Sequence, residues 1–406
     1  MVMVLHAEEL QTFWKNKVGE TVKTNQLLLD LIKFEINGVF QKENYSNIDV
    51  ETTECLIELA SKHSVLPLVL DALLKNGLYN DDTQQTFRQS LWLGVMLNEK
   101  QTAELKKLCT LFEENQICHI PLKGSVLRKY YPESWMRTCC DIDILVKPEE
   151  LDRAVKILKN SGYTIGKKAS HDISFYSKDG IHIEINYDAI ERECNLKGVN
   201  NVLERIWKYA FVKDGYEFQF EMTSEMFYFF HLAHMAKHFV HGGCGIRPFI
   251  DIIFFKKNVN YDKDKLNSLL KESGISTFAD MAEKLASIWF EGEEMIPLAE
   301  DMQKYIFAGG VYGNVENITA VNRARRGNRF KNIFSEIFLK YDVIKHKYPI
   351  LKKYKFLLPF FEVKRWCKLI FVKRYRQRSI SHLSANKAVS DEKVKTVSKL
   401  LEKLEL

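Results

Sequence analysis

The chain has 406 residues and a formal net charge of +6; 46% of its residues are hydrophobic and 28% are charged. This length is sufficient for two or three packed units, and this composition is too polar for a bundle of membrane-spanning helices. Because the sequence also shows no signal-peptide pattern and no uninterrupted apolar run long enough to span a bilayer, it predicts a globular cytoplasmic protein.

Residues 1–100 are predicted to form an N-terminal helical domain. Apolar residues recur at three- and four-residue intervals in residues 25–36 and again in residues 54–77, which is the spacing of one helix face. Gly77 closes the second stretch, at the position where a helix C-cap is expected.

Between residues 101 and 190, helical and extended segments alternate. Helices are predicted over residues 102–116, 124–131 and 148–162. Extended segments are predicted over residues 118–122, 141–146, 163–166, 173–179 and 181–188. The last two are joined at Asp179-Gly180, a dipeptide that favours a hairpin turn. This alternation predicts an α+β fold with one mixed sheet, flanked by helical domains on both sides.

After about residue 200 the helical pattern returns, most strongly in residues 225–242. We assign residues 191–320 to a C-terminal helical domain and residues 321–380 to a basic, aromatic helical region. Residues 381–406 are predicted to be a polar linker followed by a short amphipathic helix.

Asp141 and Asp143 are separated by one residue on a predicted strand, so their side chains share one face. Two carboxylates with backbones roughly 7 Å apart can share divalent cations that also hold a triphosphate, and such hard oxygen ligands suit Mg²⁺. Acidic pairs also occur as plain solvated surface. Here the neighbouring Ile142 and Ile144 indicate a largely buried strand, where an unpaired carboxylate carries a large desolvation cost.

Glu184 is the candidate for a third carboxylate. In residues 181–188, polar side chains alternate with isoleucines, so that His182, Glu184 and Asn186 share one face. A half-exposed hairpin strand without any function shows the same alternation. Beside the Asp141 strand, however, this line of potential ligands favours a site.

The Lys123-Gly124-Ser125 segment lies where a strand is followed by a helix. It offers a glycine for close approach, a hydroxyl group and a helix N-terminus for an anion. A glycine at such a junction also serves ordinary turns. Arg137, shortly before the acidic strand, either pairs with a phosphate or holds one of the two aspartates.

The combination of these motifs resembles the nucleotidyltransferases of the DNA polymerase β superfamily, which carry a glycine-serine helix start, an acidic pair on the next strand and a third acid. The closer similarity is to a bacterial nucleotidyltransferase family with the elements PLKG, Y, R, DIDILV and a later H-x-x-K-H helix. Here these elements are Pro121 to Gly124, Tyr130, Arg137, Asp141 to Val146, His234, Lys237 and His238. The resemblance spans about residues 50–260.

This resemblance implies a polymerase β-like core that transfers an NMP group from an NTP substrate to an acceptor with release of pyrophosphate. It implies that Asp141, Asp143 and Glu184 are the catalytic residues and hold two Mg²⁺ ions. Nucleotide binding is expected at Lys123, Gly124, Ser125, Arg137, His234, Lys237 and His238. The acceptor, whether protein, RNA, sugar or small molecule, stays open.

Two features depart from the family pattern. The gap from Ser125 to Asp141 is longer than in the commonest superfamily pattern. Asn186 stands where such families often carry a histidine, so no general base is assigned there; Asp251 is a candidate for that role.

Four histidines recur at three- and four-residue steps, which places them on one helix stripe. They are His231, His234, His238 and His241. A zinc site and a set of core histidines are both compatible with this spacing. The family resemblance adds a third interpretation, in which this helix faces the nucleotide pocket.

Residues 323–378 contain eighteen Lys or Arg against three Asp or Glu, about +15, so the rest of the chain carries about −9. Cations alternate there with aromatic residues. This mixture suits a membrane surface, a nucleic acid backbone or another anionic partner, and equally a solvated basic face. Two alternative functions therefore stay open: a non-catalytic nucleotide-binding or interaction protein, and an RNA- or membrane-surface-binding module.

Overall fold

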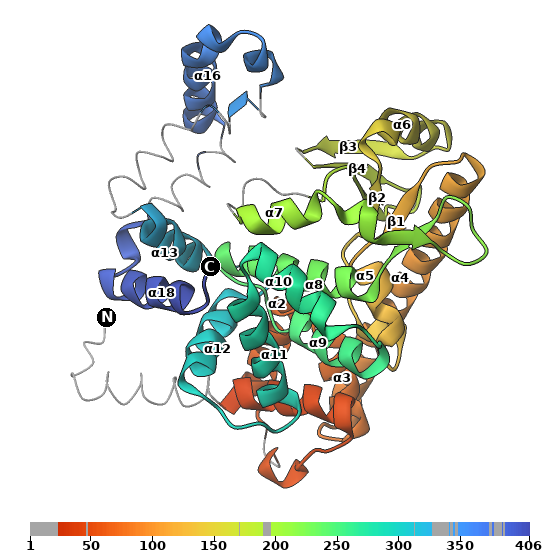
Figure 1. Cartoon of the computed structure of the whole chain (residues 1–406). Coiled ribbons are helices and arrows are strands. Elements are labelled where there is room, and N and C mark those ends of the chain that lie inside the picture. The colour runs from red at the N-terminus through yellow and green to blue at the C-terminus, as the bar shows by residue number, and fades with distance from the viewer. Residues whose placement is uncertain are drawn as a thin grey trace.

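A computed structural model describes most of the chain, including the whole predicted core apart from Ser170 and Ile190. The described ranges are residues 23–45, 48–169, 171–189, 196–311, 313–326, 348–372 and 386–406, together with residues 341, 344, 345, 376 and 384. The fold is mostly helical with one five-stranded mixed sheet (Figure 1). None of the helices in these ranges combines the length and the apolar character needed to cross a membrane.

Helices form the N-terminal part, as predicted. A helix over residues 23–37 is followed by α2 (Val50–Lys62) and α3 (Leu66–Lys75). The apolar stretch 54–77 is thus two helices. The reason is Pro67, which has no backbone N–H to continue the hydrogen bonds of α2 but fits the first turn of α3.

The helix α4 (Asp81–Glu114) connects the N-terminal helices to the sheet. It begins at Asn80, whose side chain accepts a hydrogen bond from the Thr83 N–H at 3.0 Å. Figure 1 shows it running from α3 at the bottom of the view to the sheet at the upper right. The helix is continuous through residue 100. The domain boundaries stay predictions.

The sheet confirms the alternation that the sequence predicts between residues 101 and 190. Its strands are β1 (His119–Pro121), β2 (Ile142–Val146), β3 (Thr164–Lys168), β4 (Asp172–Tyr176) and β5 (His182–Asn186). The spatial order is β1-β2-β5-β4-β3, with β2 and β5 parallel and the other neighbours antiparallel. The predicted hairpin turn joins β4 to β5, and Gly180 adopts a positive φ of 77° there.

The two faces of the sheet have different roles. One face packs against α4 and α6 (Leu151–Asn160) in an apolar cluster that includes Ile142, Ile144 and Ile183. Because side chains alternate along a strand, Asp143 and Glu184 lie on the other face. That face is directed toward the helices that follow residue 196. The sheet thereby presents its carboxylates to the inside of the molecule.

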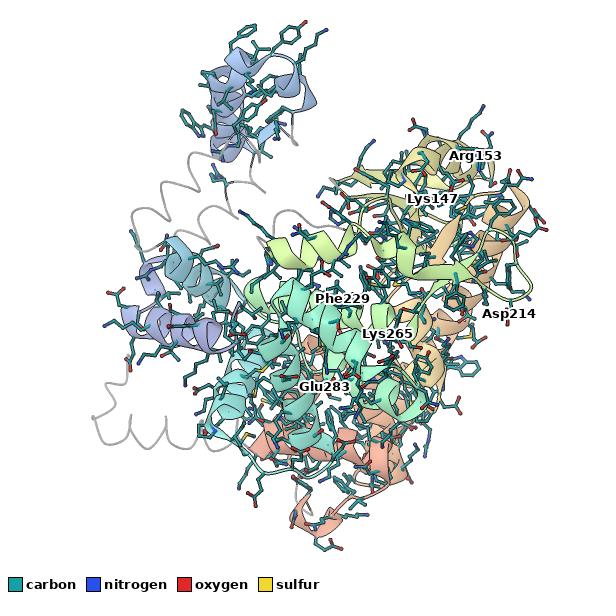
Figure 2. All side chains as sticks on the ribbon, in the orientation of Figure 1. Lys147, Arg153, Asp214, Phe229, Lys265 and Glu283 are labelled. Carbon is teal, nitrogen blue, oxygen red and sulfur yellow. The ribbon has the colours of Figure 1, made fainter. Side chains whose placement is uncertain are left out.

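The rest of the described chain is predominantly helical. Its helices are α7 (Lys197–Leu203), α8 (Ser224–Val240), α9 (Arg247–Asn258), α10 (Lys263–Ser273), α11 (Ser276–Phe290), α12 (Pro297–Gly309) and α13 (Val315–Arg326). The predicted helix at 225–242 is α8, and its Phe229 is fully buried in the helical body (Figure 2). A short hairpin of β6 (Ala210–Val212) and β7 (Phe220–Met222) was not predicted.

Among the described residues after 326, the longer helices are α16 (Leu358–Phe371) and α18 (Asp391–Lys403). The predicted short amphipathic helix is α18, which packs against α12 and α13. Much of the predicted basic region, including residues 327–340, lies outside the described residues.

Candidate functional site

A cavity of about 270 Å³ lies between the polar face of the sheet, α8 and the start of α9. It collects residues that are far apart in the sequence. Its lining includes Lys123, Gly124, Arg137, Asp141, Asp143, Glu184, His234, Lys237 and His238, all of them predicted site residues. Ser125, the other predicted nucleotide-binding residue, is not part of this lining.

Asp143 lies at the centre of the polar face, on β2. It is 4% exposed and stands opposite Glu184 in the parallel pairing of β2 with β5. The Lys123 ammonium donates a hydrogen bond to its Oδ1 at 2.8 Å, and the Asn186 amide donates to the same oxygen at 3.3 Å. The buried carboxylate is therefore paired and hydrogen-bonded, as its position requires.

The three carboxylates repel one another. Burial and then the neighbouring Asp143 and Asp141 raise the pKa of Glu184 to about 7. Burial and Asp143 also raise the pKa of Asp141 above its usual value. Lys123 is the main compensating cation: burial alone would lower its pKa, but the three carboxylates raise it above the ordinary value. This arrangement favours the binding of additional positive charge.

The backbone of Lys123 is in an unfavourable conformation. It adopts φ 47° and ψ −120°, a conformation that is unfavourable for a residue with a side chain. The turn is held by the Leu122 N–H, which donates to the Asp143 carbonyl oxygen at 3.0 Å. Strain of this kind costs on the order of 1–3 kcal/mol and is concentrated at functional sites.

Gly124, at the start of α5 (Gly124–Leu127), is required for close approach. A Cβ at this position would overlap the Sγ of Cys139 and the Nη1 of Arg137. The Ser125 N–H donates to the Leu122 carbonyl oxygen at 3.2 Å and so closes the turn. The phosphate-binding role of Ser125 stays a prediction.

Arg137 is committed to Asp251 of α9. Its Nε and Nη2 donate to the two carboxylate oxygens at 2.7 and 2.8 Å, and the Tyr131 hydroxyl donates to Oδ1 at 2.7 Å. Both partners of this ion pair are buried. The guanidinium thus fixes the loop before β2 to α9, and no hydrogen bond joins it to Asp141 or Asp143 among the described contacts. Its role in nucleotide binding stays a prediction.

Asp251 is a weak candidate for a general base. Burial alone would raise its pKa, but the Arg137 guanidinium lowers it below the ordinary value. A carboxylate that is held in a two-point ion pair has little tendency to accept a proton.

The histidine stripe of α8 lies beside the cavity. His231, His234 and His238 line it, whereas His241 is exposed. The His231 ring contacts the Pro248 carbonyl oxygen at 3.0 Å, and the Nε2 atoms of His234 and His238 are 3.2 Å apart. Burial, and next the neighbouring His238, lower the pKa of His234 well below the usual value. Within the described residues these histidines belong to no group of three potential metal ligands.

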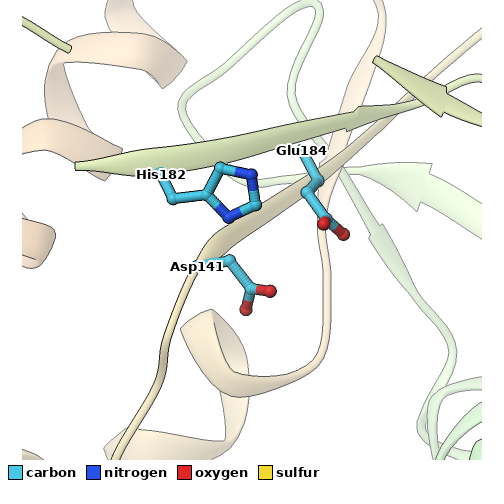
Figure 3. Close-up of side chains that lie close together, drawn as sticks. All are labelled: Asp141, His182 and Glu184. Carbon is cyan, nitrogen blue, oxygen red and sulfur yellow. The ribbon is translucent and has the colours of Figure 1, made fainter. Parts of the chain in front are cut away.

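A group of three potential metal ligands does occur at the edge of the carboxylates. Asp141, His182 and Glu184 place their ligand atoms within 4.8 Å of one another (Figure 3). The sequence placed His182 on the ligand face but did not assign it to the site. The signal was its position two residues before Glu184 on the same strand.

Asp172 is a cavity residue that sequence reasoning missed. It lies on β4 opposite Asn186, pairs with His171 at 3.0 Å and lines the cavity. No local pattern marks it, since its approach to Glu184 depends on the pairing of β4 with β5.

Residues 49–291 match a family model described as "uncharacterised nucleotidyltransferase". The match covers more than half of the chain and includes every cavity residue discussed above. Searches of curated proteins and of solved structures each returned no significant match.

Proposed function

The chain belongs to this nucleotidyltransferase family, and we propose on that premise that it moves an NMP group from an NTP to an acceptor, with release of pyrophosphate. The observation that carries the proposal is the cavity in which three carboxylates from β2, β5 and the residue before β2 meet cations from α8 and the Lys123 turn. We further propose that residues 101–190 are a polymerase β-like core. The adjacent strands with the acidic pair and the third acid support this.

The carboxylate group fits divalent cations. Asp141, Asp143 and Glu184 offer hard oxygen ligands. Burial, and next the neighbouring carboxylates, raise the pKa of Asp141 and of Glu184, and a bound cation would offset the repulsion among them. We propose that these three residues hold two Mg²⁺ ions. Bound there, the ions supply charge that stabilises the triphosphate and the leaving pyrophosphate.

The cations around the cavity are proposed to bind the triphosphate. Lys123 approaches from the β1–α5 turn, and Lys237 and His238 approach from α8. In the reaction, an acceptor oxygen forms a bond to the α-phosphorus while the bond from that phosphorus to the bridging oxygen of pyrophosphate breaks. Positive charge from Lys123 and Lys237 would offset the charge that develops on the leaving group.

The decisive experiment uses NTPs with a labelled α-phosphate. The full-length protein is incubated with them, a divalent cation and a cell extract, and labelled products are separated into protein, RNA, sugar and small-molecule fractions. Asp143→Ala is expected to reduce labelling by about 100-fold or more, since charge stabilisation at such a site contributes several kcal/mol. Asp152→Ala, on the exposed side of α6, is the matched control. Equal labelling by wild type and Asp143→Ala would refute the proposal.

A non-catalytic nucleotide-binding protein is the second candidate. The observation that favours it is the 2.8 Å ion pair of Lys123 with Asp143, which satisfies one carboxylate without any metal ion. This candidate predicts that the protein binds NTPs but that no fraction of the extract becomes labelled. Equilibrium dialysis with the same labelled NTPs separates the two candidates.

We also propose that α16 contacts an anionic membrane surface. Along α16, Phe360, Val363, Cys367 and Phe371 follow one another at helical spacing and all are exposed. Lys364 and Lys368 lie beside this stripe and are exposed as well. Exposed aromatic and aliphatic residues flanked by lysines suit the interface of an anionic bilayer.

Sedimentation with vesicles tests this contact. Binding to vesicles with anionic lipids, with little binding to neutral vesicles, is expected for wild type. It should be lost in the double variant Phe360→Glu and Phe371→Glu. Binding to RNA that survives both substitutions would point to a nucleic acid partner and against the membrane.

A further inference from the structure

The group formed by Asp141, His182 and Glu184 contains a nitrogen ligand beside the two carboxylates. His182 and Glu184 are two residues apart on β5 and lie on the same face of the sheet. The parallel register pairs Ile142 with Ile183, so Asp141, the residue before β2, stands next to His182. Figure 3 shows the three side chains on the same side of the two strands, with the imidazole directed toward the carboxylates.

The spacing of these ligands suits one ion. Ligand atoms at about 2.1 Å from a metal ion lie at most about 4.2 Å from each other. The three ligand atoms here lie within 4.8 Å of one another. The three ligand atoms therefore have to move closer together to share one ion.

The imidazole of His182 is held in place from the side. Tyr176 is its cross-strand neighbour on β4, and the two rings stack with centroids 5.1 Å apart and an interplanar angle of 30°. Because this packing already restricts the imidazole, His182 loses less conformational entropy when it binds a metal ion. His182 is also only half-buried, so an ion has access to it.

Asp143 already has two hydrogen-bond partners at one of its carboxylate oxygens. Its Oδ1 accepts hydrogen bonds from Lys123 and Asn186 at 2.8 and 3.3 Å. An ion that uses Asp143 as the third ligand has to share Oδ1 with Lys123 and Asn186 or bind the other carboxylate oxygen. An ion that uses His182 as the third ligand leaves this ion pair intact.

We propose that Asp141, His182 and Glu184 bind a divalent transition-metal ion and that His182 makes this position select Mn²⁺ over Mg²⁺. Mg²⁺ prefers oxygen ligands, whereas imidazole nitrogen favours transition metals, and Mn²⁺ accepts both imidazole and carboxylate. The inference deepens the proposed function by naming Mn²⁺ as the preferred ion at one of its two metal positions. It rests on the proposed function only for the role of that ion in the reaction. Binding itself is measured without any reaction.

The test titrates the metal-free, full-length protein with MnCl₂ and with MgCl₂ in a calorimeter. Wild type is expected to bind Mn²⁺ at least about tenfold more tightly than Mg²⁺. His182→Ala should weaken Mn²⁺ binding at least about tenfold and leave Mg²⁺ binding nearly unchanged. The exposed His241→Ala serves as the matched control and should behave as wild type.

Pulsed electron paramagnetic resonance gives a direct readout of the ligand. Mn²⁺ bound to wild type should show a nitrogen coupling from a coordinated imidazole, and this coupling should be absent in His182→Ala. A coupling that persists in His182→Ala, or an Mn²⁺ affinity that does not change, overturns the inference. Circular dichroism of both variants establishes that they are folded.

The outcomes separate this inference from the proposed function. If Mn²⁺ binds through His182 but no acceptor is labelled in the extract, the transferase proposal fails and the metal site stands. If labelling depends on Asp143 but Mn²⁺ shows no nitrogen coupling, the transferase proposal stands and the role of His182 is refuted.

Discussion

At the scale of single residues, Lys123 combines an unfavourable backbone conformation with a favourable ion pair. Its φ of 47° suits glycine, yet its ammonium is the cation that neutralises Asp143 at 2.8 Å. Strain that persists at one residue indicates a requirement for its side chain. The conflict between local conformation and residue type therefore supports a functional role for Lys123.

The strain has a measurable consequence. Lys123→Gly and Lys123→Ala both remove the ammonium, but only glycine fits the positive φ. We expect the glycine variant to be more stable than the alanine variant by about 1 kcal/mol, which reverses the usual order of these residues. Chemical denaturation measures the difference, and both variants should lose labelling activity. Greater stability of the alanine variant would argue against strain at this position.

At the scale of elements, neighbouring segments are joined by buried contacts of charged and aromatic side chains. The Arg137–Asp251 ion pair fixes the loop before β2 to α9, with 5% and 1% of the two side chains exposed. The C-terminal end of α2 packs against α12, where the His63 ring lies 5.4 Å from that of Phe307. Each contact gives a prediction about the packing of elements.

The ion pair should be sensitive to the loss of one partner. Asp251→Asn leaves the Arg137 guanidinium buried without a counter-charge, and we expect a loss of about 3–5 kcal/mol in the free energy of unfolding. The double variant Arg137→Met and Asp251→Asn should recover part of this loss. A loss in the double variant equal to the sum of the single losses would show that the two residues do not interact.

His63 should make the protein sensitive to mild acid. Burial, with a smaller contribution from Lys62, lowers its pKa to about 3, against about 6.5 in an unfolded chain. Between these values the unfolded state binds a proton and the folded state does not, so stability falls as the pH falls below about 6.5.

The comparison variant is His63→Phe, which does not titrate. Between pH 7 and pH 5, wild type should lose about 2 kcal/mol more than the variant in the free energy of unfolding. Denaturant titrations at the two pH values provide the measurement. An equal loss in both proteins would mean that His63 binds a proton as readily in the folded state as in the unfolded state.

At the scale of the whole molecule, residues beyond the family match also belong to the packed structure. The match ends at residue 291, but α18 packs against α12 and α13 with buried leucines. Arg323 of α13 donates to the Val389 carbonyl oxygen at 2.6 Å and pairs with Asp391 at the start of α18. The C-terminal helix is therefore part of the packed structure.

This predicts a stability defect for changes in α18. Leu400→Ala, at 3% exposure, should lower the free energy of unfolding by about 2–5 kcal/mol. Lys399→Ala, the exposed neighbour, should change it by less than about 0.5 kcal/mol. Thermal unfolding compares the two variants. Similar melting temperatures for both would mean that α18 contributes little to the body.

Much of the fold and of the site could be predicted from local patterns. The alternation of polar and apolar residues in β2 and β5 is a property of neighbouring residues, and it placed Asp143 and Glu184 on the polar faces of their strands. Gly180 and Pro67 are also local signals, the first for a hairpin turn and the second for the start of a new helix. The role of Pro67 was recognised only in the structure. The short hairpin after α7 was missed.

The sequence by itself determined which residues share a strand face or a helix stripe, because strand and helix periods depend only on spacing along the chain. Only the tertiary structure decided that β2 lies beside β5, that His182 reaches Asp141 and that Arg137 pairs with Asp251. These contacts join residues that are distant in sequence. They depend on which apolar faces of the helices and strands pack against each other, and spacing along the chain does not specify this.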